Sequence, residues 1–177
     1  MVDSQLFSSG SDEWYTPEWI LDLVTKVMGS IDLDPCSDPY KRVPAKNHFT
    51  KEDNGLDKCW FDNVFLNPPY GRKESPEWIK KAMYEQLHSH TYQQMLLLPA
   101  RTDTKWFNLL DVDILCFLRG RVKFVDGKGL TTNPAPFPSV LTYSGHNKDL
   151  FVKELSDYGL IYKPIKNKKQ GKTHGKV

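Results

Sequence analysis

Residues Asn67, Pro68, Pro69 and Tyr70 combine hydrogen-bond acceptors with a flat ring, directly after the apolar run 64–66. Neither proline has a backbone N–H, so carbonyl groups in this turn stay free to accept hydrogen bonds. The side chain of Asn67 adds another carbonyl, and Tyr70 offers a ring for stacking. Two acceptors beside a stacking ring suit a planar ligand that carries an NH₂ group, such as a nucleobase. These four residues alone are equally compatible with an ordinary Pro-Pro turn that closes a strand.

The surrounding pattern predicts strands that alternate with helices. Apolar residues at 20, 23, 24 and 27 form one helical face, with Thr16 as the expected N-cap, Pro17 as the first helical residue and Gly29 as the stop. We expect further helices over residues 76–88, 104–110 and 147–158, and strands over residues 30–34, 63–66, 94–98, 112–118 and 160–162, the fourth of these central and the last at an edge.

Two segments have other expected roles. Residues 121–125 are predicted to start a hairpin to which residues 139–143 return, and residues 36–60 are predicted to form a long ligand-binding loop. Alternating strands and helices indicate a parallel or mixed sheet covered on both faces.

Ligands of such α/β sheets bind beyond the carboxyl ends of the strands. Asp34 is the last residue of one predicted strand, and Asn67 directly follows another. Their side chains converge if the two strands are neighbours. The sequence around Asp34 is equally compatible with a ligand contact and with a structural role in a turn. Asp53 precedes Asn54-Gly55 and is likewise compatible with a plain turn.

An ordered series of segments resembles a known family. Asn-Pro-Pro-Tyr after a buried strand looks like the catalytic motif of amino-group methyltransferases. The accompanying segments are Tyr-Thr-Pro at 15–17, Asp-Leu-Asp-Pro-Cys-Ser at 32–37, Asp-Asn-Gly-Leu at 53–56, Leu-Pro-Ala-Arg-Thr-Asp-Thr at 98–104, Phe-Leu-Arg-Gly-Arg-Val-Lys-Phe at 117–124 and Pro-Phe-Pro-Ser at 136–139. Together they are similar to the small phage-type Dam-like DNA adenine-N6 methyltransferases over residues 12–145.

The resemblance implies a compact, partly trimmed Rossmann-like α/β sheet with helices on both faces and S-adenosylmethionine as the cofactor. The cofactor-binding residues that it implies are Tyr15, Thr16, Pro17, Asp34, Pro35, Cys36, Ser37 and Asp53. Asp34 would lie near the amino-acid end of the cofactor and Asp53 near its adenosine part. The sequence departs from the usual pattern, since residues 36–39 replace a Gly-rich turn. The short interval between Asp34 and Asn67 also leaves little room for two strand–helix units.

The same resemblance assigns catalysis to Asn67, Pro68, Pro69 and Tyr70. Double-stranded DNA is the implied partner, and the target adenine would leave the duplex to have its N6 amino group methylated without a covalent enzyme intermediate. Phe137 would form a second wall for the base, or else be a core aromatic residue. Expected DNA contacts, with ordinary surface charge as the alternative, are Arg72, Lys73, Arg101, Arg119 and Arg121. Two rival functions are a protein glutamine methyltransferase and an inactive DNA-binding relative.

Length and charge suggest one domain with distinct ends. Of the 177 residues, we expect 1–12 to be a flexible N-terminus, 13–162 a methyltransferase domain and 163–177 a basic tail. Residues 159–177 hold six lysines and no acid, which leaves 18 basic and 22 acidic residues elsewhere. Such a tail can hold phosphates, or it can be a solvated end.

Several classes of protein are disfavoured. No apolar stretch approaches the roughly 18 residues that cross a bilayer, and the polar N-terminus does not resemble a secretory signal. The three cysteines show no metal-ligand spacing, so we expect no metal and a reduced, cytoplasmic protein. A phage or prophage gene in a bacterial host is implied only by the resemblance. The target sequence and the oligomeric state are not encoded in any pattern we recognise.

Overall fold

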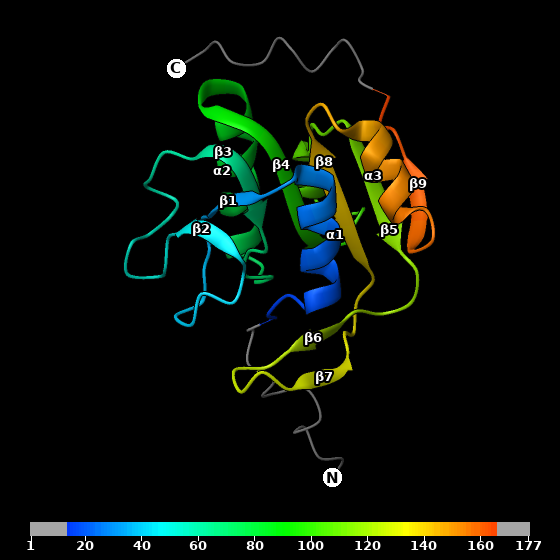
Figure 1. The fold of residues 1–177 in the computed structure, drawn as a ribbon, viewed down its shortest axis with the longest axis horizontal. Coiled ribbons are helices and arrows are strands. Elements are labelled where there is room, and N and C mark those ends of the chain that lie inside the picture. Colours follow the sequence, from blue (N-terminus) through cyan, green and yellow to red (C-terminus); the bar gives the residue numbers. More distant parts are fainter. Residues whose placement is uncertain (1–13, 166–177) are drawn as a thin grey trace.

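The computed structural model describes residues 14–165, which fold around one seven-stranded sheet (Figure 1). Its strands are Ile31–Asp34 (β1), Ala45–His48 (β2), Phe61–Leu66 (β3), His90–Pro99 (β4), Ile114–Leu118 (β5), Ser139–Ser144 (β8) and Gly159–Tyr162 (β9). Lys123–Val125 (β6) and Thr131–Pro134 (β7) form a separate two-stranded sheet. The helices are Glu18–Met28 (α1), Glu74–His88 (α2) and Lys148–Leu155 (α3), with a 3₁₀ turn at Phe107–Leu109 (η1).

The large sheet is mixed, with strand order β2-β1-β3-β4-β8-β5-β9. Strands β2, β1, β3 and β4 are parallel to one another, whereas β8 is antiparallel to both β4 and β5. Strand β5 is paired on both sides, and β9 forms the edge beyond it. The carboxyl ends of β1, β3, β4 and β5 therefore lie along one edge of the sheet, where α/β folds bind their ligands.

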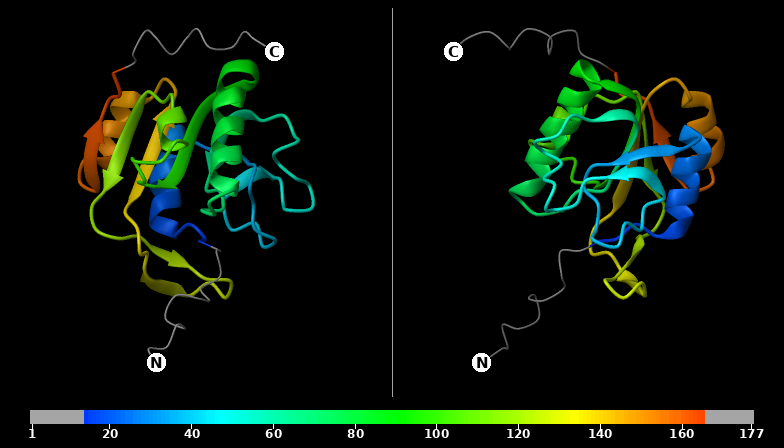
Figure 2. Two further views of the ribbon diagram at one scale, coloured as in Figure 1. Left: turned by 180° about the vertical axis from the view of Figure 1, so that it is seen from behind. Right: turned by 60° about the vertical axis from the view of Figure 1, so that its left-hand side comes forward.

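Helices cover both faces of this sheet, as predicted. Helices α1 and α3 lie together on one face, and α2 with η1 lies on the other (Figures 1 and 2). Each face has its own buried apolar cluster. The first cluster contains Ile20, Val24 and Phe151, and the second contains Trp60 and Ile79. The apolar spacing of α1 accounts for its buried side, and Gly29, at φ 81°, ends that helix as expected.

The Rossmann-like sheet is trimmed on the β2 side. The connections at residues 35–44 and 49–60 contain no helix, so β1, β2 and β3 run parallel without helical crossovers. Residues 36–60 were predicted to be entirely loop, which is wrong at β2. This strand has little apolar character. It is held by its ladder to β1 and by the Asn47 amide, which donates to the Asp32 carbonyl at 3.1 Å.

The predicted partner of residues 121–125 is also wrong. Residues 139–143 do not return to that segment but form β8, which is buried along its whole length between β4 and β5. The hairpin instead closes locally between β6 and β7. Smaller differences concern helix ends, since α2 begins two residues early and α3 is shorter than residues 147–158. Residues 1–12 and most of the expected tail, 166–177, lie outside the described residues.

Candidate functional site

A cavity of about 520 Å³ opens at the carboxyl ends of β1 and β3. This volume lies within the range of small-molecule and cofactor sites. Its wall is made of residues 14–16, 34–39, 42–43, 50–52, 54–55, 67–69, 74 and 78. The structure thus brings the Asn-Pro-Pro turn together with Asp34 and the segment before α1, as the sequence predicted.

The Asn67 side chain is fixed by contacts on both of its ends. Its amide nitrogen donates to the Trp14 carbonyl at 2.6 Å and contacts the Thr16 hydroxyl at 2.9 Å. Because the Trp14 carbonyl can only accept, the nitrogen must face that side and the amide oxygen must face away. The Thr16 hydroxyl therefore does not cap α1 as predicted. It anchors Asn67 instead, and Pro17 is the N-cap.

Tyr70 orients the Asn67 oxygen. The Tyr70 hydroxyl donates to Asn67 Oδ1 at 2.6 Å and lies 3.2 Å from the Leu97 carbonyl. The amide oxygen keeps its second lone pair for another donor. The Tyr70 ring is 6% exposed, so the structure shows it as a support for Asn67 and not as an open stacking surface.

The two proline carbonyls of the turn differ in their hydrogen bonding. The carbonyl of Pro69 accepts from the Ser75 hydroxyl at 3.1 Å, which ties the turn to the first residues of α2. Among residues 14–165, no donor is seen at the Pro68 carbonyl, and Pro68 lines the cavity. Asn67 and Pro68 are therefore the two acceptors that the turn presents to a ligand.

Phe137 lies in an aromatic cluster behind this turn. Its ring meets Tyr70 edge-on with 5.4 Å between centroids and Trp14 with 5.3 Å between centroids. Phe124 of β6 packs against Tyr70 and Trp14 as well. Phe137 is 8% exposed, and the guanidinium of Arg101 lies 5.8 Å from its ring centroid. The structure thus places Phe137 next to the turn at residues 67–70 and within the core, while its contact with a base stays a prediction.

Asp34 presents a buried carboxyl to the cavity. The backbone N–H of Cys36 donates to Asp34 Oδ1 at 3.1 Å, and His48 Nδ1 lies 4.0 Å from Oδ2. Burial raises the pKa of Asp34 to about 7, and burial also lowers the pKa of His48. The imidazole is therefore neutral near neutral pH and does not neutralise Asp34. A cation in the cavity would favour the ionised form of this carboxyl.

Gly55 packs closely against the segment that replaces the usual Gly-rich turn. Residues 35–39 follow β1 directly, and a Cβ on Gly55 would lie 1.9 Å from the Pro35 carbonyl oxygen. Close backbone approach is a usual reason for glycine at a ligand site. Here the close approach is between Gly55 and the backbone of Pro35, and both residues line the cavity.

We expect Gly55→Ala to destabilise the protein by about 1–3 kcal/mol, because the new methyl group displaces the Pro35 backbone. Chemical denaturation measures this change. Gly71→Ala is the matched control, since its Cβ would meet only the carboxylate end of the flexible Glu74 side chain. Equal stability of the two variants would contradict the close approach at Gly55.

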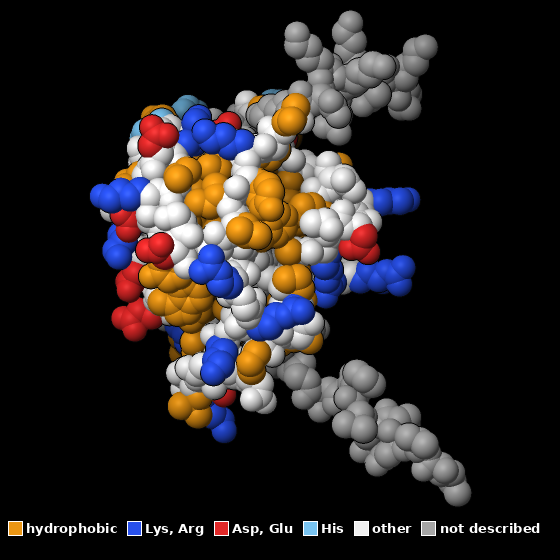
Figure 3. Space-filling view, turned by 90° about the vertical axis from the view of Figure 1, so that its right-hand side faces the viewer, with side chains coloured by type: hydrophobic (Ala, Val, Ile, Leu, Met, Phe, Trp, Pro, Cys, Tyr) orange, Lys and Arg blue, Asp and Glu red, His pale blue; other side chains and the backbone are white. Residues whose placement is uncertain are grey.

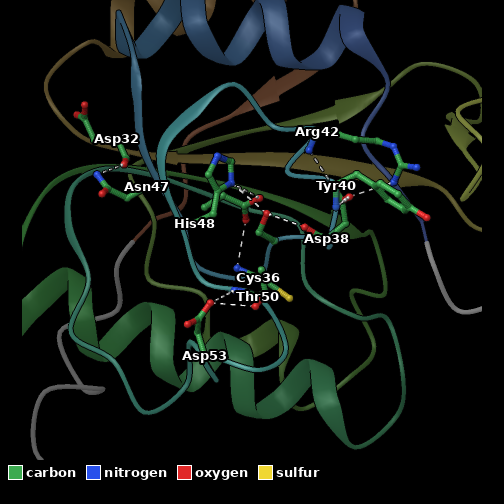
Figure 4. Close-up of polar contacts among 11 residues, drawn as sticks. Asp32, Cys36, Asp38, Tyr40, Arg42, Asn47, His48, Thr50 and Asp53 are labelled. Carbon is green, nitrogen blue, oxygen red and sulfur yellow. Dashed lines mark hydrogen bonds and ion pairs between the residues drawn. The ribbon is translucent and has the colours of Figure 1, made fainter.

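Arg42 is a wall residue that the sequence analysis missed. Its guanidinium pairs with Asp38 at 3.1 Å and lies 4.7 Å from the Tyr40 ring centroid (Figure 4). It also lies 4.3 Å from the Tyr15 ring centroid and donates to the Gly127 carbonyl at 2.6 Å. It therefore joins the loop after β1 to both the N-terminal segment and the β6–β7 hairpin. No local sequence pattern signals a contact between residues 85 positions apart.

Two predicted cofactor residues lie apart from the cavity wall. Asp53 accepts hydrogen bonds from the backbone N–H and the hydroxyl of Thr50, at 2.8 and 2.9 Å, and thereby closes a turn (Figure 4). These contacts hold the pKa of Asp53 below its usual value. Its neighbour Glu52 lines the cavity instead. Pro17 begins α1, whereas Tyr15, Thr16, Pro35, Cys36 and Ser37 are all wall residues.

The predicted DNA contacts are exposed and lie at the same edge of the sheet. Arg72 and Lys73 follow the catalytic turn, Arg101 follows β4, and Arg119 and Arg121 follow β5. Figure 3 shows Lys and Arg side chains over the lower part of the β9 face, toward the hairpin. Arg119 also donates to the Asp157 carbonyl at 3.1 Å. This shared edge fits a common phosphate-binding surface, although each contact remains a prediction.

Comparison with known protein families decides the assignment. The model of the family described as DNA N-6-adenine-methyltransferase (Dam) matches residues 3–173. The chain belongs to this Dam family. No curated protein gives a significant match. At the family level, this membership makes the protein a DNA N6-adenine methyltransferase.

Two further observations concern residues 14–165. None of their helices has the length and apolar content to cross a membrane. Nor do these residues contain a group of three or more His, Cys, Asp or Glu side chains placed to hold a metal ion.

Proposed function

We propose that this protein transfers a methyl group from S-adenosylmethionine to the N6 amino group of adenine in double-stranded DNA. The observation that carries the proposal is the pair of acceptors at Asn67 and Pro68 on the wall of a cavity that also contains the Asp34 carboxyl. Membership of the Dam family supports DNA adenine as the substrate.

The cavity fits the proposed cofactor in chemistry as well as in volume. S-adenosylmethionine supplies an electrophilic methyl group on its sulfonium, and it carries an ammonium group and two ribose hydroxyls. The buried carboxyl of Asp34 suits the ammonium group, because a cation nearby favours its ionised form. Glu52 lies on the wall and Asp53 does not, so we assign Glu52 to the ribose hydroxyls. Trp14, Tyr15 and Thr16 close the site beside Asn67.

The turn at Asn67 prepares the adenine nitrogen for attack. The lone pair of this amino group is delocalised into the ring, which makes it a poor nucleophile. When Asn67 Oδ1 and the Pro68 carbonyl accept its two hydrogens, the nitrogen becomes more tetrahedral and its lone pair is available. The anchors of Asn67 at Trp14 and Thr16 hold this geometry before the substrate arrives.

Transfer is direct, without a covalent enzyme intermediate. Burial and the neighbouring Asp34 raise the pKa of the Cys36 thiol, so the one cysteine on the cavity wall stays protonated. A protonated thiol is a weak nucleophile. Positioning of the two reactants by the turn and the cavity then supplies much of the acceleration.

The base must leave the duplex to reach Asn67, because its amino group is otherwise paired and stacked. Tyr70 and Phe137 are the aromatic side chains next to the turn, and we assign them to the walls of the base pocket. Both are nearly buried here. Stacking on a flipped adenine therefore requires the aromatic cluster to open when DNA binds.

Methyl transfer from radiolabelled S-adenosylmethionine to unmethylated duplex DNA, followed by nucleoside analysis, tests the proposal. Label in N6-methyladenine is the expected result. Label in protein glutamine would support the rival methyltransferase, and cofactor binding with no label in any nucleoside would support an inactive DNA-binding relative. Either of these outcomes would overturn the proposal.

We also expect the lysine-rich tail to add non-specific DNA affinity. Deleting residues 164–177 should weaken DNA binding and flatten its dependence on salt, because fewer counterions are released. Strand β9 is antiparallel to β5, so its carboxyl end lies at the end of the sheet away from the cavity. A DNA contact by the tail should therefore not depend on the target sequence. Binding isotherms at several salt concentrations measure the slope. A variant with glutamine in place of the tail lysines controls for length, and an unchanged slope in both variants would contradict a DNA contact by the tail.

A further inference from the structure

The β6–β7 hairpin projects beyond the catalytic edge of the sheet and ends in an ordered turn (Figure 1). Asp126 Oδ1 accepts from the backbone N–H groups of Lys128 and Leu130, both at 2.9 Å. The Asp126 N–H donates to the Leu130 carbonyl at 2.9 Å, and Gly129 adopts φ 81°. Leu130 is thus held on both sides of its backbone, yet its side chain is 63% exposed.

The hairpin is tied to the cavity at three points. Val125 exchanges two backbone hydrogen bonds with Tyr15, at 3.2 and 2.9 Å. Phe124 packs edge-on against Tyr70, with 6.0 Å between centroids. Arg42, a wall residue, donates to the Gly127 carbonyl at 2.6 Å. In the structure without DNA, these contacts place the turn of the hairpin beside Tyr15 and Tyr70.

The surface of the hairpin has the charge expected of a DNA contact. Arg121, Lys123 and Lys128 are exposed on or beside it. The acidic residue in its turn, Asp126, uses its carboxylate to hold backbone N–H groups. A two-stranded ribbon of this kind fits a DNA groove. An exposed leucine is not unusual by itself. Leu130 differs because its backbone is held in place within a basic hairpin, beside the proposed base-binding site.

We propose that Leu130 is a wedge that enters the duplex next to the target adenine and occupies the space that the flipped base leaves. This inference rests on the proposed function and extends it to a residue outside the cavity. Apolar side chains that insert between base steps unstack them and stabilise a distorted duplex. Leu130 has no polar group to pair with the orphaned base, so it acts by filling volume. Its effect should depend on how strongly the target adenine is paired.

The first experiment locates the methylated adenines by sequencing DNA treated with the wild-type protein. Two duplexes are then compared at that site, one with a normal base pair and one with an abasic position opposite the adenine. Leu130→Ala should methylate the paired duplex at least about tenfold more slowly than wild type, because the variant cannot fill the space left by the unpaired base. On the abasic duplex it should stay within about threefold of wild type.

Matched variants separate a wedge from a structural role. Leu130→Phe keeps the apolar bulk and should retain activity on the paired duplex. Leu87→Ala removes a leucine that is 70% exposed near the end of α2, at the opposite edge of the sheet, and should leave both rates unchanged. With 2-aminopurine at the target position, fluorescence should rise when wild type binds and rise much less with Leu130→Ala.

The outcomes distinguish the two proposals. No N6-methyladenine from the wild type would overturn the proposed function and the wedge together. An active wild type with equally active Leu130→Ala on the paired duplex would overturn the wedge alone. Equal losses on the paired and the abasic duplex would also overturn it, since Leu130 would then support the fold or general DNA binding.

Discussion

Replacing Asn67 with alanine is expected to reduce methyl transfer by about 10²–10³-fold, the range seen when one oriented polar group is removed from a reaction centre. The variant loses the acceptor that Tyr70 orients toward the substrate. It also loses the contacts of the amide nitrogen with Trp14 and Thr16. We therefore expect the affinity for S-adenosylmethionine to fall as well, but by only a few fold.

Thr16→Val separates these two effects. It removes one anchor of the Asn67 amide and keeps the amide oxygen, so its loss of methyl transfer should be much smaller than that of Asn67→Ala, with a similar loss of cofactor affinity. Single-turnover rates at saturating cofactor report the chemical step, and calorimetry reports the affinity. If Asn67→Ala lost cofactor binding as completely as it lost activity, Asn67 would be a structural residue and not an acceptor for the substrate.

Asp34→Asn is expected to weaken the binding of S-adenosylmethionine by about 10–100-fold, because it removes a buried charged partner for the ammonium group. The same change should stabilise the protein without cofactor at high pH. The pKa of Asp34 is about 7 in the folded protein and near its ordinary value of 3.8 when unfolded. Since the folded pKa is raised, the stability present below pH 3.8 is lost as the pH rises through 7.

This loss corresponds to about 4 kcal/mol above pH 7, and the asparagine side chain of the variant would not titrate. Denaturation without cofactor should therefore show Asp34→Asn to be more stable than wild type at about pH 8 and similar to it near pH 4. Asp53→Asn is the comparison, because that carboxylate is exposed and only closes a turn. An affinity loss at Asp53 equal to that at Asp34 would contradict the placement of these two residues.

The elements with strong apolar periodicity could be predicted from the sequence, whereas their pairing could not. The spacing of Ile20, Leu23, Val24 and Val27 defines α1 because burial on one face determines that helix. Residues 139–143 were predicted to be a strand but were given the wrong partner. Alternation and apolarity indicate burial and carry no information about which strand lies alongside. In the structure these residues are buried between β4 and β5.

Strand β2 was missed for a different reason. Ala45–His48 has polar residues at both central positions, and its contacts come from the partner strand. Lys46 pairs with Asp32 at 2.6 Å, and the Asn47 amide binds the Asp32 backbone. Such contacts exist only after β1 and β2 have aligned, so a local pattern does not reveal them.

The site was predictable where residues directly follow strands and less so inside loops. Asp34 and Asn67 could be placed because the carboxyl ends of neighbouring parallel strands share an edge. Whether Glu52 or Asp53 lines the cavity depends on the orientation of the turn that contains them. Thr50 donates to the Asp53 carboxylate, which closes this turn. Tyr70 was expected to stack on a base, and its hydroxyl contact with Asn67 had no sequence signal.

The separate strand pairing of the β6–β7 hairpin has a consequence for how this protein can evolve. Within the described residues, β6 and β7 form a ladder with each other that is not continuous with the seven-stranded sheet. Exposed positions such as Thr131 and Asn133 can therefore be substituted without disturbing the strands that carry the catalytic turn. If the hairpin contacts DNA as proposed, drift in this short segment would alter the preferred DNA sequence and preserve the proposed methyl-transfer chemistry. A lineage would then acquire new target sites through a few surface substitutions, with no change of fold and no added domain.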